Sequence, residues 1–354
     1  MKRLNLGVLL NAEYESSELI RLAGLAEELG YQRFWYVDVR LMRECYVGLA
    51  SIAMRTQRIA LATGVVDPYS RHPAITASAL ATLDELSGGR AIMGLGLGGA
   101  GFRELGLSKT LPIAALRECV AMVRGLWRGE EVTIAGKVVS LDRGTLQFTP
   151  PRSRIPIYIA TQGEQVSRLA GEIAEGVLIA NTVSEAGLDF YLGQIRAGAA
   201  KAGRPVEEVD IDLRWELCLS EDEDAAIDAM RRRLAQRMIN GYPNWGFLKQ
   251  LGVEAGPDFT AIAAKKDQGL LDAATAALPM DVVNASMVAG NPTRVARLIA
   301  PMLRPEVAGI TIRPHACAGT GIADVMRSFV LDVMPLVERH RQQAATRDAK
   351  ETPG

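Results

Sequence analysis

The sequence predicts an α/β protein folded as a (β/α)8 TIM barrel with insertions. Short apolar runs alternate with longer amphipathic stretches along most of the 354 residues, which is the pattern of repeated strand–helix units. The apolar runs are continuous, as in parallel strands that are covered on both faces. Eight such units favour a closed barrel over an open doubly wound sheet, and no linker-like stretch divides the chain into two domains.

Eight apolar runs are expected to form the barrel strands. They are Leu4–Leu10, Phe34–Val37, Ile59–Val65, Ala91–Leu95, Ile157–Ala160, Val177–Ala180, Asp210–Leu219 and Gly309–Arg313. The helices between them have recognisable ends. Gly30 ends a helix over Ser17–Leu29, and Pro73 opens a helix that ends near Leu86, before Ser87-Gly88-Gly89.

Two stretches interrupt the repeat. A β-hairpin is expected near residues 131–149, with turns at Gly136 and Gly144. A helical insertion is expected near residues 223–280, and its aromatic part, Tyr242–Phe259, is predicted to form a wall of the substrate pocket or a subunit contact. Residues 1–341 are thus expected to form one domain, followed by a polar, disordered tail at 342–354.

Composition excludes several classes of function. A formal net charge of −1 offers no basic surface for nucleic acid, and no apolar stretch is long enough to span a membrane. The three histidines form no metal-binding motif. The four cysteines have no CxxC spacing, which indicates free thiols in a reducing, cytoplasmic compartment.

Candidate catalytic residues stand where strands end, because the active site of such barrels lies at the carboxyl ends of the strands. Asp38 follows the aromatic run Phe34-Trp35-Tyr36, where burial could perturb its pKa. His72 lies in the loop after the third strand. We expect both to handle protons, with helix capping for Asp38 and a structural hydrogen bond for His72 as the alternatives.

Candidate cofactor-binding residues follow the fourth, fifth and sixth strands. Residues 94–99 match GxGxxG, but they follow the fourth strand, so we interpret Gly96 and Gly98 as a loop that lets a flat ring approach rather than a dinucleotide fingerprint. Thr161, Gln162 and Gly163 precede a helix, whose free N–H groups would bind a phosphate. The Gly176 region and Asn181 flank this place, and ordinary helix capping is the alternative.

Three segments together resemble the luciferase-like monooxygenase superfamily. They are Gly64–Ala77 (GVVDPYSRHPAITA), Ala81–Arg90 (ATLDELSGGR) and Gly94-Leu95-Gly96. The chain is most similar to the F420-dependent methylenetetrahydromethanopterin reductase branch. Residues 155–158 (IPIY) and 170–176 (AGEIAEG) extend the similarity.

The resemblance implies a cofactor ring at the ends of strands two to four, backed by a non-prolyl cis peptide that corresponds to Gly64–Val65. It places Asp38 and Asp67 close to the ring. It also implies that the backbone of Gln162 and Gly163, with Gly176 and Val177, holds the cofactor phosphate. Gly99 stands where F420-dependent relatives often have a carboxylate.

The expected function is hydride transfer between F420 or a flavin (FMN) and a small organic substrate. One alternative is a two-component monooxygenase that uses reduced FMN and dioxygen. The other is a barrel that binds flavin without catalysis. Family members commonly dimerise through barrel helices, so a homodimer is expected.

Overall fold

The computed structural model describes residues 4–99 and 101–351, and within them eight parallel strands close into a barrel. These strands are β1 (Asn5–Leu10), β2 (Arg33–Tyr36), β3 (Ala60–Thr63), β4 (Ala91–Leu95), β7 (Ile157–Thr161), β8 (Gly176–Ala180), β9 (Asp210–Leu219) and β11 (Val307–Pro314). Pairing of β8 with β9 and of β11 with β1 completes the ring. The predicted (β/α)8 barrel is confirmed, with strand ends within two residues of those expected.

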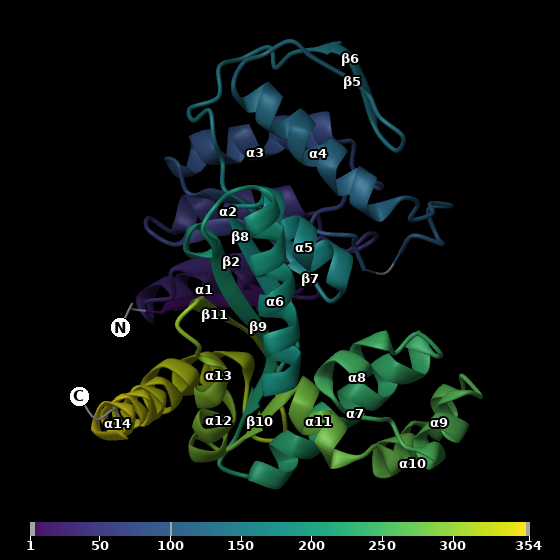
Figure 1. Ribbon diagram of the computed structural model, residues 1–354, viewed down its shortest axis with the longest axis vertical. Coiled ribbons are helices and arrows are strands. Elements are labelled where there is room, and N and C mark those ends of the chain that lie inside the picture. Colours follow the sequence, from purple (N-terminus) through teal and green to yellow (C-terminus); the bar gives the residue numbers. More distant parts are fainter. Residues whose placement is uncertain (1–3, 100, 352–354) are drawn as a thin grey trace.

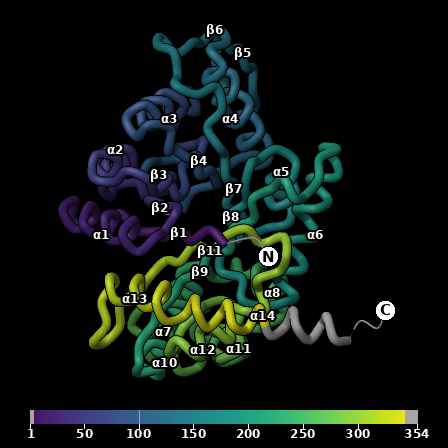
Figure 2. The backbone as a smooth tube through the Cα atoms, turned by 90° about the vertical axis from the view of Figure 1, so that its left-hand side faces the viewer, coloured from purple at the N-terminus to yellow at the C-terminus, as the bar shows by residue number. Residues whose placement is uncertain are grey.

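The helices cover the outside of the barrel in chain order, and α1 to α4 follow one another along one side (Figure 2). They are α1 (Ser16–Glu28), α2 (Cys45–Arg55), α3 (Pro73–Ser87), α4 (Pro112–Trp127), α5 (Glu164–Ile173), α6 (Glu185–Lys201), α12 (Pro292–Ile299), α13 (Ile322–Ser328) and α14 (Met334–Glu351), with short helical turns η1 (Val206–Glu208), η3 (Ala300–Met302) and η4 (Phe329–Val333). The helix ends predicted for α3 are confirmed: the helix begins at Pro73, and Gly88 ends it with a left-handed φ of 67°.

The carboxyl end of the chain differs from the predicted disordered tail. Helix α14 continues to Glu351, and residues 352–354 lie outside the described residues. The segment is rich in Ala, Gln, Arg and Lys, residues with high helix propensity, which explains how it continues the helix.

Both predicted insertions are present. Strands β5 (Val132–Ala135) and β6 (Ser140–Gly144) form an antiparallel hairpin. The second insertion comprises α7 (Glu223–Gly241), α8 (Gly246–Leu251), α9 (Pro257–Ala263), η2 (Gln268–Leu270), α10 (Leu271–Ala277) and α11 (Met280–Ser286). It has its own apolar core around Leu234 and Phe259 and lies below the barrel in Figure 1. Strand β10 (Val288–Gly290), which is not one of the eight expected barrel strands, then pairs with the end of β9.

The amino-terminal half of the barrel interior is filled. Arg33 of β2 reaches across to β9, where its Nη1 lies 2.9 Å from Oδ2 of Asp212 and its Nη2 lies 2.5 Å from Oδ2 of Asp210. The next layer is Trp35 packed edge-to-face on Tyr158, with ring centroids 5.5 Å apart. Space for a ligand therefore remains only toward the carboxyl ends of the strands.

The surroundings of Asp212, which pairs with Arg33, strongly change the pKa of its carboxyl group. Asp212 has no exposed surface, and burial raises its pKa to about 7, although the nearby Arg33 opposes the rise. The charge on Arg33 therefore determines how well this acidic side chain is tolerated inside the barrel.

We expect Arg33→Met to lower the free energy of unfolding by about 3–5 kcal/mol, because it leaves a buried carboxylate without its opposite charge. Urea unfolding followed by circular dichroism measures this value. Arg21→Met is the matched control, since it removes an exposed ion pair with Glu18 and should change stability by less than about 1 kcal/mol. Equal losses in the two variants would contradict a structural role for the interior pair.

Candidate functional site

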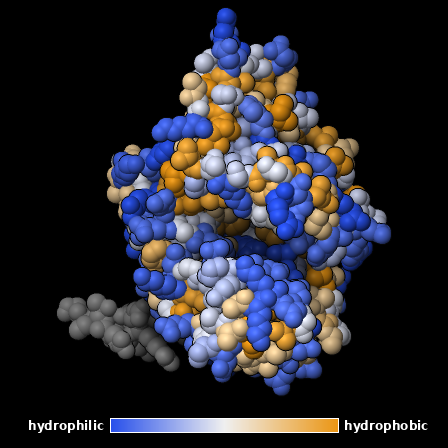
Figure 3. Space-filling view, turned by 90° about the vertical axis from the view of Figure 1, so that its right-hand side faces the viewer, coloured by the Kyte–Doolittle hydropathy of each residue, from blue (hydrophilic) through white to orange (hydrophobic). Residues whose placement is uncertain are grey.

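A pocket of about 570 Å³ lies at the carboxyl ends of the barrel strands, within the usual size range of small-molecule sites. Its floor is apolar and is formed by Leu9, Val65, Ala160 and Leu178, directly above the filled half of the barrel. Figure 3 shows the molecule hollowed across the middle of one face. The position agrees with the expectation that the site forms where the strands end.

One side of the pocket is made of glycine backbone. The peptide bond between Gly64 and Val65 is cis, as the resemblance implied, and both residues line the pocket together with Gly96 and Gly98. A Cβ atom at Gly96 would lie 2.7 Å from Cγ2 of Val65, too close for any side chain. The backbone at Gly96 thus packs closely on Val65, and close approach of a ring to this loop stays a prediction.

The amino end of α5 forms another side of the pocket. Thr161, Gln162 and Gly163 line it, as does Val166 in the first turn of the helix. Gly163 is the N-cap residue, and a Cβ atom there would meet nothing within 4 Å. The start of this ten-residue helix therefore faces open space, an arrangement that favours a bound anion.

Two predicted phosphate-binding residues lie at the wrong end of the barrel. Gly176 begins β8 and pairs with Asp210 at the start of β9, and both Gly176 and Val177 are buried away from the pocket. At about 3.3 Å per residue, Gly176 lies roughly 7 Å along the strand from Leu178, the first residue of β8 that lines the pocket. Asn181, which follows the other end of β8, does line the pocket. Within β8, the pocket is lined by Leu178 and Ala180 and not by the first two residues of the strand.

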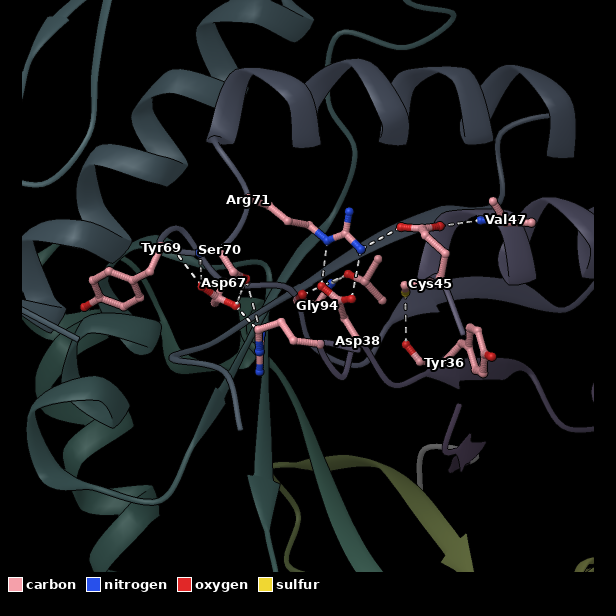
Figure 4. A network of polar contacts seen from close by, with 12 residues as sticks. Tyr36, Asp38, Cys45, Val47, Asp67, Tyr69, Ser70, Arg71 and Gly94 are labelled. Carbon is pink, nitrogen blue, oxygen red and sulfur yellow. Dashed lines mark hydrogen bonds and ion pairs between the residues drawn. The ribbon is translucent and has the colours of Figure 1, made fainter. Parts of the chain in front are cut away.

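Asp38 lines the pocket, but its carboxylate is already paired. Arg71 donates two hydrogen bonds to it, from Nε at 2.8 Å and from Nη2 at 3.0 Å, and a third to Glu44 at 2.6 Å. Figure 4 shows Arg71 reaching from its loop toward Asp38. This bidentate pair fixes the carboxylate at the edge of the pocket, so Asp38 is suited to orient a bound group.

Asp67 lies behind the pocket wall rather than on it. Its carboxylate accepts hydrogen bonds from the Ser70 hydroxyl at 2.6 Å, from the N–H groups of Tyr69 and Ser70 at 2.8 Å, and from Arg40 at 2.5 Å. Figure 4 shows it enclosed by this loop. The predicted contact with the ring is therefore replaced by support of the loop after β3.

His72 does not reach the pocket. Its Nδ1 accepts a hydrogen bond from the N–H of Ala74 at 3.2 Å, so Nε2 carries the proton and donates to the carbonyl of Ser140 at 2.9 Å. The side chain thus caps α3 and holds the β5–β6 hairpin against the barrel. His72 therefore makes structural hydrogen bonds, which was the alternative expectation. It does not lie where it could handle a proton in the pocket.

The expected aromatic wall is also displaced. Tyr242 and Trp245 line a separate open pocket of about 1150 Å³ on the helical insertion. In the part of the chain that the structure describes, Arg237 of α7 is the one residue of the insertion that lines the main pocket. The wall contributed by the insertion is therefore cationic instead of aromatic.

Three charged pocket residues were missed from the sequence: Arg214 and Glu216 of β9, and Arg237. A signal was available, because Asp210, Asp212, Arg214 and Glu216 alternate along the strand, which places four charged side chains on its inner face. Glu216 lies within hydrogen-bond or ion-pair distance of Arg214, Arg233, Arg237, Arg313 and His315. Its side chain is only 4% exposed.

The charge state of this cluster follows from its burial. Burial alone would raise the pKa of Glu216, but Arg214, His315 and Arg313 hold it well below its ordinary value. Burial lowers the pKa of Arg214 to about 10, against the attraction of Glu216, and burial also lowers the pKa of His315. At neutral pH the carboxylate is therefore ionised, the guanidinium is charged and the imidazole is neutral.

Comparison with known proteins identifies the family. The model of the luciferase-like monooxygenase family matches residues 6–304. The chain belongs to this family.

Similar luciferase-like proteins include several reductases. The 5,10-methylenetetrahydromethanopterin reductase of Methanolobus tindarius is 37% identical over 72% of this chain and 77% of its own length. The F420-dependent tetrahydromethanopterin reductase structure from Methanopyrus kandleri superimposes with a TM-score of 0.82 at 27% identity, over 94% of this chain and 99% of that one. An F420-dependent glucose-6-phosphate dehydrogenase of Nakamurella multipartita is 32% identical over 62% of this chain and 68% of its length.

No helix within residues 4–99 and 101–351 is long and apolar enough to cross a membrane. The acidic, histidine and cysteine side chains of those residues form no group that could hold a metal ion.

We expect Glu216→Gln to lower the free energy of unfolding by about 3–5 kcal/mol at pH 7, because it leaves the buried guanidiniums without their carboxylate. The folded-state pKa of Glu216 is depressed, so its contribution is complete above the ordinary value of 4.5 and falls as the pH drops below it. Urea unfolding at pH 7 and at lower pH should show the gap between wild type and variant narrowing in acid.

The matched control for this experiment is Glu185→Gln, which removes an exposed partner of Arg304 and should have little effect at either pH. A constant gap between wild type and Glu216→Gln across the pH range would contradict the assigned charge state.

Proposed function

We propose that this protein transfers a hydride between the deazaflavin F420 and a small organic substrate. The observation that carries the proposal is one pocket that joins an apolar floor, a glycine-lined wall at Gly64 and Gly96, and the open amino end of α5. These features fit a flat ring that carries a phosphate on its side chain. The relatives whose names include F420 support this choice of cofactor.

The residues of this chain would bind and orient the cofactor. The floor around Leu9 and Leu178 would exclude water from one face of the ring, while the glycine backbone at Gly96 would let the ring lie close to the wall. The first turn of α5, starting at Gly163, would hold the phosphate. When bound, the deazaflavin supplies the carbon that accepts or gives the hydride, and the protein supplies position and electrostatics.

The geometry also bears on the two rival functions. A barrel that merely stores flavin would enclose it, whereas this pocket opens at the surface. Flavin monooxygenases share the fold, as the EDTA monooxygenase from Chelativorans does with a TM-score of 0.66 at 19% identity. That likeness is limited to the fold, so FMN and dioxygen are tested as an outcome of the cofactor experiment.

We expect F420 to bind saturably and more tightly than FMN in equilibrium titrations followed by absorbance. Gly163→Leu should weaken F420 binding by at least about tenfold, because the leucine side chain would fill the space at the start of α5 where the phosphate is proposed to bind. Gly193→Leu is the matched control, since a Cβ atom there also meets nothing within 4 Å and the residue is exposed on α6. Preferential binding of FMN, with oxygen uptake when the flavin is reduced, would instead identify a monooxygenase.

The proposal extends to assembly and location. Helices α2 and α3 expose Val47, Met54 and Ile75, each more than 60% accessible, and exposed large apolar side chains are frequent at subunit interfaces. We therefore propose a homodimer through α2 and α3.

We also propose that the protein is cytoplasmic, because its four cysteines are free thiols, which a reducing compartment maintains.

We expect Met54→Glu to convert the dimer to monomers in sedimentation velocity, because it buries a charge in the apolar interface. Leu331→Glu in η4 changes another exposed apolar side chain and should leave the dimer intact. A monomeric wild type, or a dimer that survives Met54→Glu, would contradict the interface.

A further inference from the structure

The pocket edge between β9 and α7 carries more positive than negative charge. Glu216 Oε2 lies 2.7 Å from His315 Nε2 and 2.8 Å from Arg233 Nε, and its Oε1 lies 3.2 Å from Nη2 of Arg214 and from Nη1 of Arg313. Nη1 of Arg237 lies 3.8 Å from Oε1. One carboxylate therefore faces four guanidinium groups.

The excess charge is not balanced elsewhere in the described chain. None of the ion pairs within residues 4–99 and 101–351 gives any of these four arginines a carboxylate other than Glu216. Four positive charges against one negative charge leave an excess of three. Such an imbalance at a partly buried pocket wall attracts anions, because water screens the charges less there than at an open surface.

Two of the four guanidinium groups line the pocket, and they differ in the hydrogen bonds that they already make within the protein. Arg214 donates to Oδ1 of Asn181 at 2.7 Å and to Glu216 at 3.2 Å. Arg237 approaches Glu216 only at 3.8 Å, beyond hydrogen-bond distance, and its side chain is 37% exposed. Arg237 is therefore the guanidinium that can donate to a ligand, while Arg214 is fixed beside it.

The pocket thus has two places suited to anions. One is the amino end of α5 at Gly163, beyond the end of β7, and the other is Arg237, next to Glu216 of β9. Strand β8, which is followed by Asn181, stands between them in the barrel. A cofactor with its phosphate at the first place leaves the second for another ligand.

We propose that Arg237, supported by Arg214, binds a carboxylate or phosphate group of the substrate, so that the substrate is an organic anion. This inference rests on the proposed function for the assignment of the ligand as substrate. The planar guanidinium can donate two parallel hydrogen bonds to either group, which gives orientation as well as affinity. The apolar floor at Leu9 and Leu178 would receive the uncharged part of the same molecule.

The test uses benzoate as the anionic probe and benzamide as its neutral counterpart. Isothermal titration calorimetry measures both in the full-length protein, with and without F420. We expect wild type to bind benzoate at least about tenfold more tightly than benzamide, and Arg237→Gln to weaken benzoate binding about tenfold while leaving benzamide binding unchanged. Arg237→Lys should retain part of the preference for the anion.

The matched control is Arg232→Gln, which removes one positive charge from the same helix. Arg232 is exposed and pairs with Asp272, and it does not line the pocket, so its loss should leave benzoate binding as in wild type. Equal weakening in both variants would mean that overall charge, and not a site at Arg237, attracts the anion, and the proposal would be wrong.

A second arm separates the substrate from the cofactor as the source of the anion. F420 and the deazaflavin chromophore without its phosphate-bearing side chain are titrated into wild type and Arg237→Gln. If the variant weakens binding of F420 but not of the chromophore, Arg237 holds the cofactor side chain and the substrate assignment is wrong. Equal affinities of F420 for both proteins support it.

The two proposals fail in different ways. Wild type that does not bind F420 contradicts the proposed function, and the titrations without cofactor still decide whether Arg237 forms an anion site. Wild type that binds F420 but does not distinguish benzoate from benzamide contradicts the anion site alone.

Discussion

The space inside the barrel is the constraint on which the rest of this structure depends. Eight parallel strands enclose a volume that side chains must fill, because close packing stabilises the fold. Here the Arg33–Asp212 pair and the Trp35–Tyr158 contact fill the amino-terminal half. The remaining space opens at the carboxyl ends of the strands, and every pocket residue takes its position from that division.

The carboxylates around the pocket are held rather than free. Arg71 binds Asp38, Arg40 and Ser70 bind Asp67, and a group of arginines surrounds Glu216. A carboxylate that accepts several charge-assisted hydrogen bonds is held in one position. This arrangement agrees with a protein that positions a cofactor and a substrate while the cofactor supplies the reactive carbon.

The charge of the pocket wall is uneven. Gly99 lines the pocket without a side chain, and a Cβ atom there would meet nothing within 4 Å. Near Glu216, four guanidinium groups face one carboxylate. The proposed anion site depends on this excess of positive charge.

The sequence by itself determined the barrel and much of its ligand-facing backbone. Strand periodicity, helix signals at Pro73 and Gly88, and the motif around Gly64 are local properties, so they are readable in a single chain. The tertiary structure alone decided that Gly176 lies at the far end of its strand and that His72 binds the hairpin at Ser140.

It also brought Glu216 of β9 together with His315, 99 residues further along the chain, and with Arg237 of the insertion. Such pairings depend on strand direction, register and the path of an insertion, none of which a local pattern specifies.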